Sequence, residues 1–296
     1  MIRRFFIRYT VLLATIVSSQ SLAADPEQHF TLNNTHLIPL TSKETNINYE
    51  LVITLPSSYT SFPEKKYPVL YYVDAYWDAP LVNAVYGGLI YDVLAPEFIM
   101  VGISYAGKNI NYDKERLRDL TPTKVVRRDE ISGGAPAFLR FIKESVVPFV
   151  EKNYRGDNTE RALSGSSLGG LFAIYAMYQG PNFFERYIAI SPAADWDGDY
   201  LAKLDAAYAK NNKTLNARLF LSYSRDEYKP FGDPIAALQQ QIKKRNYQGL
   251  ALKNYVMQDV RHAGVKPEGY VHGLMWAWKD IAPTGPSGLE QAYKAR

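Results

Sequence analysis

The chain has 296 residues, of which 47% are hydrophobic and 22% are charged, and these fractions exclude a disordered, collagen-like or coiled-coil protein. The formal net charge is +4, but the first 23 residues carry three basic residues and no acidic one. The remainder is therefore nearly neutral, which argues against a nucleic acid or another polyanion as partner. The sequence contains no Cys, so disulfides and a lipid-modified cysteine are excluded.

The N-terminal segment has the pattern of a secretory signal peptide. A short basic stretch precedes the apolar run at residues 11–17, and Ser21-Leu22-Ala23 offers small residues where a signal peptidase cleaves. The apolar run is too short for a permanent membrane helix. We therefore expect residues 1–23 to be removed, and a periplasmic or secreted mature protein without stable membrane insertion. An uncleaved N-terminal anchor is the alternative.

The remaining residues alternate between strand and helix patterns. Almost uninterrupted apolar runs, as at 68–73 and 98–103, are typical of strands covered on both faces. The expected strands are 48–55, 68–73, 98–103, 161–164, 187–190, 217–223 and 251–257, and the expected helices are 137–150, 168–178, 200–209 and 234–243. This alternation predicts an α/β fold with a mostly parallel central sheet and helices on both faces.

Nothing in the composition divides residues 24–296, which contain no repeat and no low-complexity linker. We therefore expect them to form a single domain. Residues 106–128 lack clear periodicity and are expected to cross the sheet edge, where binding loops often lie. Pro148 is expected to kink or restart the helix that contains it.

The strongest chemical signal is Gly165-Ser166-Ser167-Leu168-Gly169-Gly170, which fits G-x-S-x-G with Ser167 at its centre. The motif lies between a predicted strand and a predicted helix, which is the context of a nucleophile elbow. A Cβ at either flanking glycine would clash, because the turn brings backbone against backbone. We therefore predict that Ser167 is the nucleophile of a serine hydrolase.

A serine nucleophile needs a histidine base, and the chain has four histidines. In α/β-hydrolases the order along the chain is Ser, then Asp or Glu, then His, which leaves His262 and His272. His272 lies at 269–276, which reads as a loop opening onto a last amphipathic helix, and is the predicted base. His262 lies closer to the preceding strand and is interpreted as a surface histidine.

The acid is expected after the strand at 217–223, in Ser224-Arg225-Asp226-Glu227. The usual G-x-x-D spacing of that turn places the carboxylate at Glu227, with Ser224 in the glycine position. Asp226 is the immediate alternative. An acid after the preceding strand, Asp195 or Asp197, is a more distant one.

The developing oxyanion needs backbone donors, one after the nucleophile and one after an early strand. These positions predict the N–H of Leu168 and that of Ala75 or Tyr76. No group of side chains has the spacing of metal ligands, so neither a metal nor another cofactor is expected.

Several motifs together resemble the putative esterase family of α/β-hydrolases, which includes esterase D, feruloyl esterases, enterobactin esterases and mycolyltransferases. The motifs are YPVLYYVDAYW, RLRDLTPT, GSSLGG followed by LFAIYA, and YIAISPAADW. The resemblance covers about residues 45 to 282. It implies an α/β-hydrolase fold and a serine esterase that forms an acyl-enzyme, with Ser167, Glu227 and His272 as the triad. Ser224 departs from the glycine usual in the family, and some siderophore esterases in it use a Ser–His pair without an effective acid.

A signal-bearing member of that family resembles the enterobactin-type esterases, which open siderophore triesters. Trp77 and Trp196 are then candidates to stack on catecholate rings, and Arg118 is a candidate to meet their negative charge, with a structural role of Arg118 as the alternative. The implied partner is a small-molecule ester, and the sequence does not indicate an oligomeric state. The alternative is a general short-acyl or feruloyl-type carboxylesterase. An acyltransferase and a non-catalytic binding protein are more distant readings, because fold does not decide function.

Overall fold

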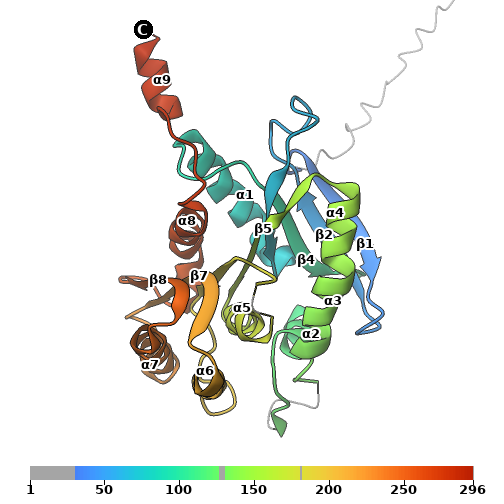
Figure 1. Cartoon of the computed structure of the whole chain (residues 1–296). Coiled ribbons are helices and arrows are strands. Elements are labelled where there is room, and N and C mark those ends of the chain that lie inside the picture. Colours follow the sequence, from blue (N-terminus) through green and yellow to red (C-terminus); the bar gives the residue numbers. More distant parts are fainter. Residues whose placement is uncertain (1–30, 127–130, 181, 296) are drawn as a thin grey trace, which may run out of the picture. The chain divides into compact units, whose positions relative to one another are not determined.

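The fold is built on an eight-stranded sheet, in which the strands lie side by side in the order β1-β2-β4-β3-β5-β6-β7-β8 (Figure 1). The pairs β1–β2 and β2–β4 are antiparallel and the other neighbours are parallel. The strands are β1 (Thr35–Thr41), β2 (Asn48–Thr54), β3 (Tyr67–Tyr72), β4 (Ile99–Tyr105), β5 (Gly156–Ser166), β6 (Arg186–Ile190), β7 (Thr214–Ser224) and β8 (Gln248–Met257). The predicted mostly parallel sheet is confirmed.

The structure is a computed structural model, and it describes residues 31–126, 131–180 and 182–295. The predicted signal segment, residues 1–23, lies outside the described residues, so its cleavage stays a prediction. Within the described ranges, no helix is long and apolar enough to cross a membrane.

Helices cover both faces of the sheet, as expected. Apolar residues of α1 and α8 pack in one core, and those of α3, α4, α5, α6 and α7 pack in the other. The helices are α1 (Ala75–Tyr91), α2 (Tyr112–Asp119), α3 (Ala135–Phe141), α4 (Val147–Asn153), α5 (Leu168–Gln179), α6 (Tyr200–Asn211), α7 (Lys229–Arg245), α8 (Val265–Trp278) and α9 (Gly288–Lys294). Burial on both sides explains why the parallel strands read as continuous apolar runs.

The helix expected at 137–150 is three helical segments in succession. A π-helical turn, Ile142–Val146, joins α3 to α4, and Pro148 lies in the first turn of α4. Proline has no N–H to donate to the preceding turn, and a π-turn accommodates that missing bond without ending the helix. The predicted restart at Pro148 is therefore confirmed.

Several elements, among them β1, α1, α2 and α9, were not expected from the sequence pattern. The edge strand β1 is mostly exposed and contains Pro39, so it shows no clean alternation of apolar and polar residues. Helix α1 contains Pro80 and two adjacent glycines, which weaken its helical pattern. The 106–128 excursion also contains a helix, α2.

The six parallel strands, β4, β3, β5, β6, β7 and β8, end at one edge of the sheet. Five of them, β3, β5, β6, β7 and β8, are followed directly or after a short turn by a polar side chain, and these are Asp74, Ser167, Ser191, Glu227 and His262. Ligand and reaction sites of α/β sheets form at this edge, because the strand ends and the loops after them converge there. These five residues are therefore the first candidates for the functional site.

Candidate active site

Ser167 occupies the sharp turn between β5 and α5. Its backbone has φ 59° and ψ −118°, a conformation that residues with a Cβ rarely adopt. A Cβ on Gly165 would lie 2.5 Å from the backbone carbon and oxygen of Gly169, and one on Gly169 would lie 2.7 Å from the Val73 side chain. The steric need for both glycines is thus confirmed, and the turn has the geometry of a nucleophile elbow.

Amide groups without helical acceptors meet beside the elbow. The first N–H groups of a helix have no partner inside that helix, and Leu168 begins α5 while Ala75 and Tyr76 begin α1. The close approach of Gly169 to Val73 brings these two helix starts together. The positions suit the expected oxyanion donors, whose role stays a prediction.

The Glu227 carboxylate lies in the interior directly behind the site, with its side chain only 1% exposed. Its Oε1 accepts a hydrogen bond from the Ser191 hydroxyl and lies 2.7 Å from His262 Nδ1. Its Oε2 accepts the backbone N–H of Ser224 at 3.4 Å. A buried carboxylate held in this way can orient an imidazole ring and stabilise its charged form.

The histidine beside Glu227 is His262, so the predicted pairing of Glu227 with His272 is wrong. Because Nδ1 of His262 points at the carboxylate, Nε2 is the nitrogen left to face a substrate. The His262 side chain is 45% exposed, and Phe231 packs edge-on against its ring at 4.6 Å. His272 instead lies inside α8, where its ring centroid is 4.5 Å from that of Tyr255.

Two glycines on either side of His272 explain why His272 was predicted as the base. Gly269 and Gly273 suggested a loop, but a Cβ on either would lie 2.6 Å from Ile190 or Ile188 respectively. The two glycines are four residues apart and therefore share one face of α8, and their lack of side chains lets α8 lie close on β6. Paired glycines at this spacing are the sequence signal for a closely packed helix here, and His262 precedes that helix.

The alternative acid, Asp226, holds the loop that leads to His262. Its Oδ2 accepts the backbone N–H of Asp259 at 2.6 Å. Ser224, which stands where the family often has glycine, donates its hydroxyl to the Val260 carbonyl at 2.6 Å. The departure from glycine therefore supplies a second tie to the same loop, and Asp226 has no contact with the imidazole among the described hydrogen bonds.

Ser191 is a site residue that the sequence analysis missed. It directly follows β6 with φ 43°, is fully buried, and donates its hydroxyl to the same Glu227 oxygen that faces His262. Its Oγ also lies 3.4 Å from His262 Nδ1. It lies in the segment YIAISPAADW that supports the family resemblance, which is the signal that could have identified it.

We expect Ser191→Ala to lower kcat about tenfold to a hundredfold, because a hydrogen bond to a charged carboxylate is lost. KM should change little, since Ser191 is buried beneath the acid. The control is Ser191→Gly, which removes the hydroxyl but relieves the positive φ. Steady-state kinetics should show the same loss for both variants; normal turnover in the glycine variant would show that the Ser191 hydroxyl is not needed.

An ion pair between Asp74 and Arg116 links the 106–128 segment to the start of α1. Asp74 has φ 59° and is nearly buried, and Arg116 reaches both its oxygens, at 3.0 Å from Nε and 2.8 Å from Nη2. Burial acts to lower the pKa of Arg116, but the hydrogen bonds and charge of Asp74 outweigh it, so the pKa is raised and the guanidinium stays charged. This ion pair holds the turn from which Ala75 and Tyr76 present their amides.

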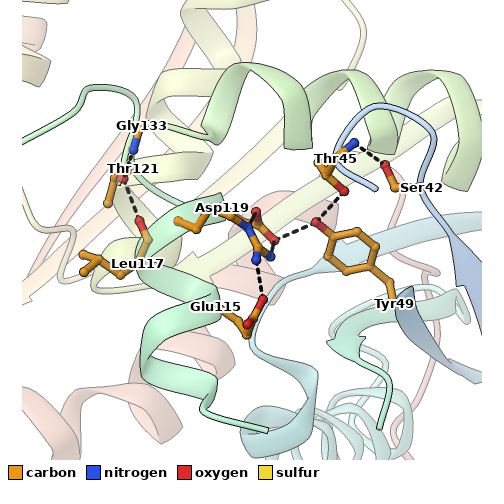
Figure 2. A network of polar contacts seen from close by, with 9 residues as sticks. Ser42, Thr45, Tyr49, Glu115, Leu117, Asp119, Thr121 and Gly133 are labelled. Atoms are coloured by element: carbon orange, nitrogen blue, oxygen red, sulfur yellow. Dashed lines mark hydrogen bonds and ion pairs between the residues drawn. The ribbon is translucent and has the colours of Figure 1, made fainter. Parts of the chain in front are cut away.

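Arg118, the candidate substrate contact, is paired with carboxylates in the structure. Arg118 donates from Nε and Nη2 to Asp119 at 2.7 and 2.9 Å, and it also pairs with Glu115. Asp119 is fully buried and accepts the Tyr49 hydroxyl at 2.7 Å (Figure 2). The guanidinium therefore holds Asp119, whose bond with Tyr49 ties α2 to β2, and contact of Arg118 with a substrate stays a prediction.

The two predicted tryptophans differ in exposure. Trp77 is 58% exposed beside the start of α1, where a ligand can reach it. Trp196 is 6% exposed and its indole donates to Thr123 Oγ1 at 2.9 Å, so the prediction that it stacks on a substrate is wrong. Its neighbours Asp195 and Asp197, the distant alternative acids, are exposed between β6 and α6, whereas Glu227 holds the carboxylate position at the imidazole.

The doubly covered sheet, the elbow and the buried carboxylate–imidazole pair define an α/β-hydrolase of the serine esterase class. Residues 42–251 match the family described as "Putative esterase". The chain therefore belongs to the putative esterase family and is a carboxylic ester hydrolase. The resemblance that the motifs indicated is confirmed.

Known relatives agree with this assignment. The chain is 28% identical over 281 residues to the ferri-bacillibactin esterase BesA of Bacillus subtilis, covering 87% of this chain and 93% of that protein. It is 37% identical over 117 residues to the siderophore triacetylfusarinine C esterase of Aspergillus fumigatus, covering 39% and 40%. The crystal structure of the BES protein from Bacillus cereus superposes with a TM-score of 0.76 at 25% identity, covering 86% of this chain and 98% of that one.

Proposed function

We propose that this esterase cleaves siderophore esters in the periplasm or outside the cell, with Ser167, His262 and Glu227 as its catalytic triad. The observation that carries the triad is the 2.7 Å contact between His262 Nδ1 and buried Glu227, at the sheet edge that also bears the Ser167 elbow. The order along the chain is Ser, Glu, His, as in other α/β-hydrolases.

In the proposed mechanism, Ser167 Oγ attacks the ester carbonyl carbon while His262 Nε2 takes the hydroxyl proton. The amides of Leu168 and of Ala75 or Tyr76 stabilise the oxyanion. His262 then returns the proton to the leaving alcohol as the ester C–O bond breaks, and the acyl group stays on the serine. Water, activated by the same imidazole, releases the acid and restores the free hydroxyl.

The substrate class is supported by the relatives and by one exposed side chain. Two relatives are named for ester-containing siderophores, bacillibactin and triacetylfusarinine C. Trp77 lies beside the proposed oxyanion amides with most of its indole accessible, which suits a substrate that carries aromatic rings. The sequence reading of an enterobactin-type substrate points in the same direction.

The test is a comparison of substrates on the purified mature protein. Iron-free and ferric bacillibactin and enterobactin are incubated with enzyme beside p-nitrophenyl acetate and butyrate, and products are separated by chromatography. We expect a kcat/KM for at least one siderophore at least a hundredfold above that for the short esters. Efficient hydrolysis of only the short esters would instead favour a general carboxylesterase.

The location is tested separately. Cleavage after Ala23 predicts that mass spectrometry of the mature protein finds an N-terminus at Ala24. Recovery of the intact N-terminus in a membrane fraction would favour the uncleaved anchor.

Two matched variants test whether Glu227 or Asp226 is the acid of the triad. Glu227→Gln is expected to lower kcat by about 10³ to 10⁴, because a neutral amide neither stabilises the imidazolium nor holds the correct tautomer. Asp226→Asn should be mild, since an amide oxygen can still accept the Asp259 N–H. Two mild results would indicate a Ser–His pair without an effective acid, and the reverse order would move the role to Asp226.

A further inference from the structure

The last helix, α9, is amphipathic, and its apolar face is exposed. Leu289, Ala292 and Tyr293 are three and four residues apart, so they lie on one face of α9 and form what we call the α9 stripe. Leu289 is 55% exposed and Tyr293 is 65% exposed, and every residue from 289 to 295 is exposed. The apolar face of a helix in a folded protein ordinarily packs against another surface.

A helix as short as α9 needs such a surface in order to be stable. It has seven residues, and isolated helices shorter than about 12 residues are marginal in water. A capping box closes its first turn: Ser287 Oγ accepts the Glu290 N–H at 3.2 Å, and Glu290 Oε2 accepts the Ser287 N–H at 2.7 Å. The cap satisfies backbone donors but buries no apolar side chain, so the stripe still needs a partner surface.

A cavity at the end of α8 offers a matching surface. It has a volume of about 500 Å³, and its α8 residues run from His272 to Lys279, at the opposite end of the helix from His262. Most of its lining is apolar and includes Leu94, Phe220, Met275 and Trp276. No residue of α9 lines it within the part of the chain that the structure describes. Pockets of this size accept a bulky side chain or a small ligand.

The link between this cavity and α9 restricts where the stripe can go. Pro283 and Pro286 lie in the link, and each proline fixes its own φ and restricts the residue before it. The link therefore has few conformations, even with Gly285 between the prolines. The start of α9 is also held at Tyr91, the last residue of α1, because a Cβ on Gly288 would overlap the Tyr91 ring. These restraints keep the stripe outside the cavity of its own chain.

The rim of the cavity carries two lysines and one aspartate that form no ion pair with another described residue. Lys253 and Lys279 line the cavity, Asp92 precedes the lining residue Val93, and all three charged residues are exposed. The other carboxylates of these segments are already engaged. Glu268 accepts the Tyr255 hydroxyl at 2.6 Å, and Asp280 pairs with Arg186 and Arg218.

The charges of α9 complement this rim. Glu290 follows the stripe residue Leu289, and Lys294 follows Tyr293, so an acid and a base flank the stripe. With the stripe in a cavity of this kind, Glu290 can meet a rim lysine while Lys294 meets Asp92. The capping box uses only Oε2 of Glu290, which leaves Oε1 for the lysine.

We propose that the protein forms a two-fold symmetric dimer in which the α9 stripe of each copy enters the α8 cavity of the other. Because stripe and cavity belong to the same chain, a two-fold axis makes both contacts at once and closes the assembly. The dimer also covers Tyr91 and Leu94, which are 53% and 38% exposed beside the two surfaces. Each contact is small, so we expect a dissociation constant of about 1 to 100 µM.

Analytical ultracentrifugation of the full mature chain over a wide concentration range should show a monomer–dimer equilibrium. Leu289→Ser combined with Tyr293→Ser removes the stripe, and Leu94→Asp places a charge at the cavity. Each should weaken dimerisation about tenfold or more. The matched controls are Gln291→Ala, on the polar face of α9, and Val256→Asp, an apolar residue 42% exposed outside the cavity. Both controls should dimerise like the wild type, and ester hydrolysis should be unchanged in all variants.

Engineered cysteines give a second readout, because the chain contains no Cys of its own. One copy carries Tyr293→Cys, a differently tagged copy carries Met275→Cys, and the mixture is oxidised. A disulfide between the copies requires the two Cα atoms to approach within about 7 Å. The control pair is Gln291→Cys with Met275→Cys. Faster cross-linking of the first pair than of the control pair supports the dimer.

Three results would overturn the proposal. The first is a monomer at every concentration, including a monomer that binds lipid vesicles through α9. The second is equal cross-linking of the two pairs. The third is a disulfide within one chain when both Tyr293→Cys and Met275→Cys are present in the same copy at high dilution, which would place the stripe in its own cavity. None of these results bears on the proposed esterase function, whose tests use substrates and triad variants.

Discussion

Ser167→Ala is expected to lower kcat by about 10⁶. The hydroxyl supplies the electron pair that forms the acyl-enzyme, and removing a triad nucleophile in a comparable serine hydrolase has a cost of this size. The measurement is hydrolysis of p-nitrophenyl butyrate and of a catecholate siderophore, with a fluorophosphonate probe that labels the wild-type serine. A variant that keeps more than a few per cent of activity would remove Ser167 from the nucleophile role.

The matched control lies on the same strand. Ser164 is fully buried in β5 and its hydroxyl has no hydrogen-bond partner among the described residues. Ser164→Ala therefore removes an unsatisfied polar group and should leave activity and the unfolding temperature close to those of the wild type. Ala at position 167 meets the same backbone strain as Ser, so its unfolding temperature should also change little. An inactive variant with a normal unfolding temperature separates chemistry from folding.

The second large effect distinguishes the two histidines. His262→Ala should lower kcat by about 10⁶, because the loss of the base has a cost similar to the loss of the nucleophile. His272→Ala should keep activity within a few-fold, since His272 contacts Tyr255 inside α8 and not the Glu227 carboxylate. Both are compared by steady-state kinetics, with circular dichroism to show that each variant folds. Loss of turnover in His272→Ala alone would contradict the site as the structure assembles it.

The central fold could be predicted because its signals are local. Parallel strands buried on both faces read as apolar runs, and each expected strand is present within a few residues of its predicted ends. The edge strand β1 and helix α1 escaped prediction for the opposite reason. Exposure of β1 removes the alternation, and Pro80 with two glycines interrupts the pattern of α1.

The position of Ser167 was also determined locally. Gly165 is required because a Cβ there would meet the backbone of Gly169, only four residues further along the chain. Gly169 has a non-local reason, since a Cβ there would meet the Val73 side chain, but the G-x-S-x-G pattern already marks both positions. The Glu227 position followed from a short spacing after β7. The contact of Ser191 with Glu227 joins the ends of two neighbouring strands that are far apart in the chain, so only the family segment around Ser191 could have indicated its role.

By itself, then, the sequence determined the sheet, the elbow serine and the turn that carries the acid, since each depends on residues close together in the chain. Only the tertiary structure decided which histidine meets that acid and which tryptophan is accessible. The glycines of α8 serve helix–sheet contact and do not mark a loop, and Trp196 is buried against Thr123 while Trp77 is exposed. Those outcomes depend on which surfaces pack together across the fold, and packing between distant segments leaves no pattern that the neighbouring residues reveal.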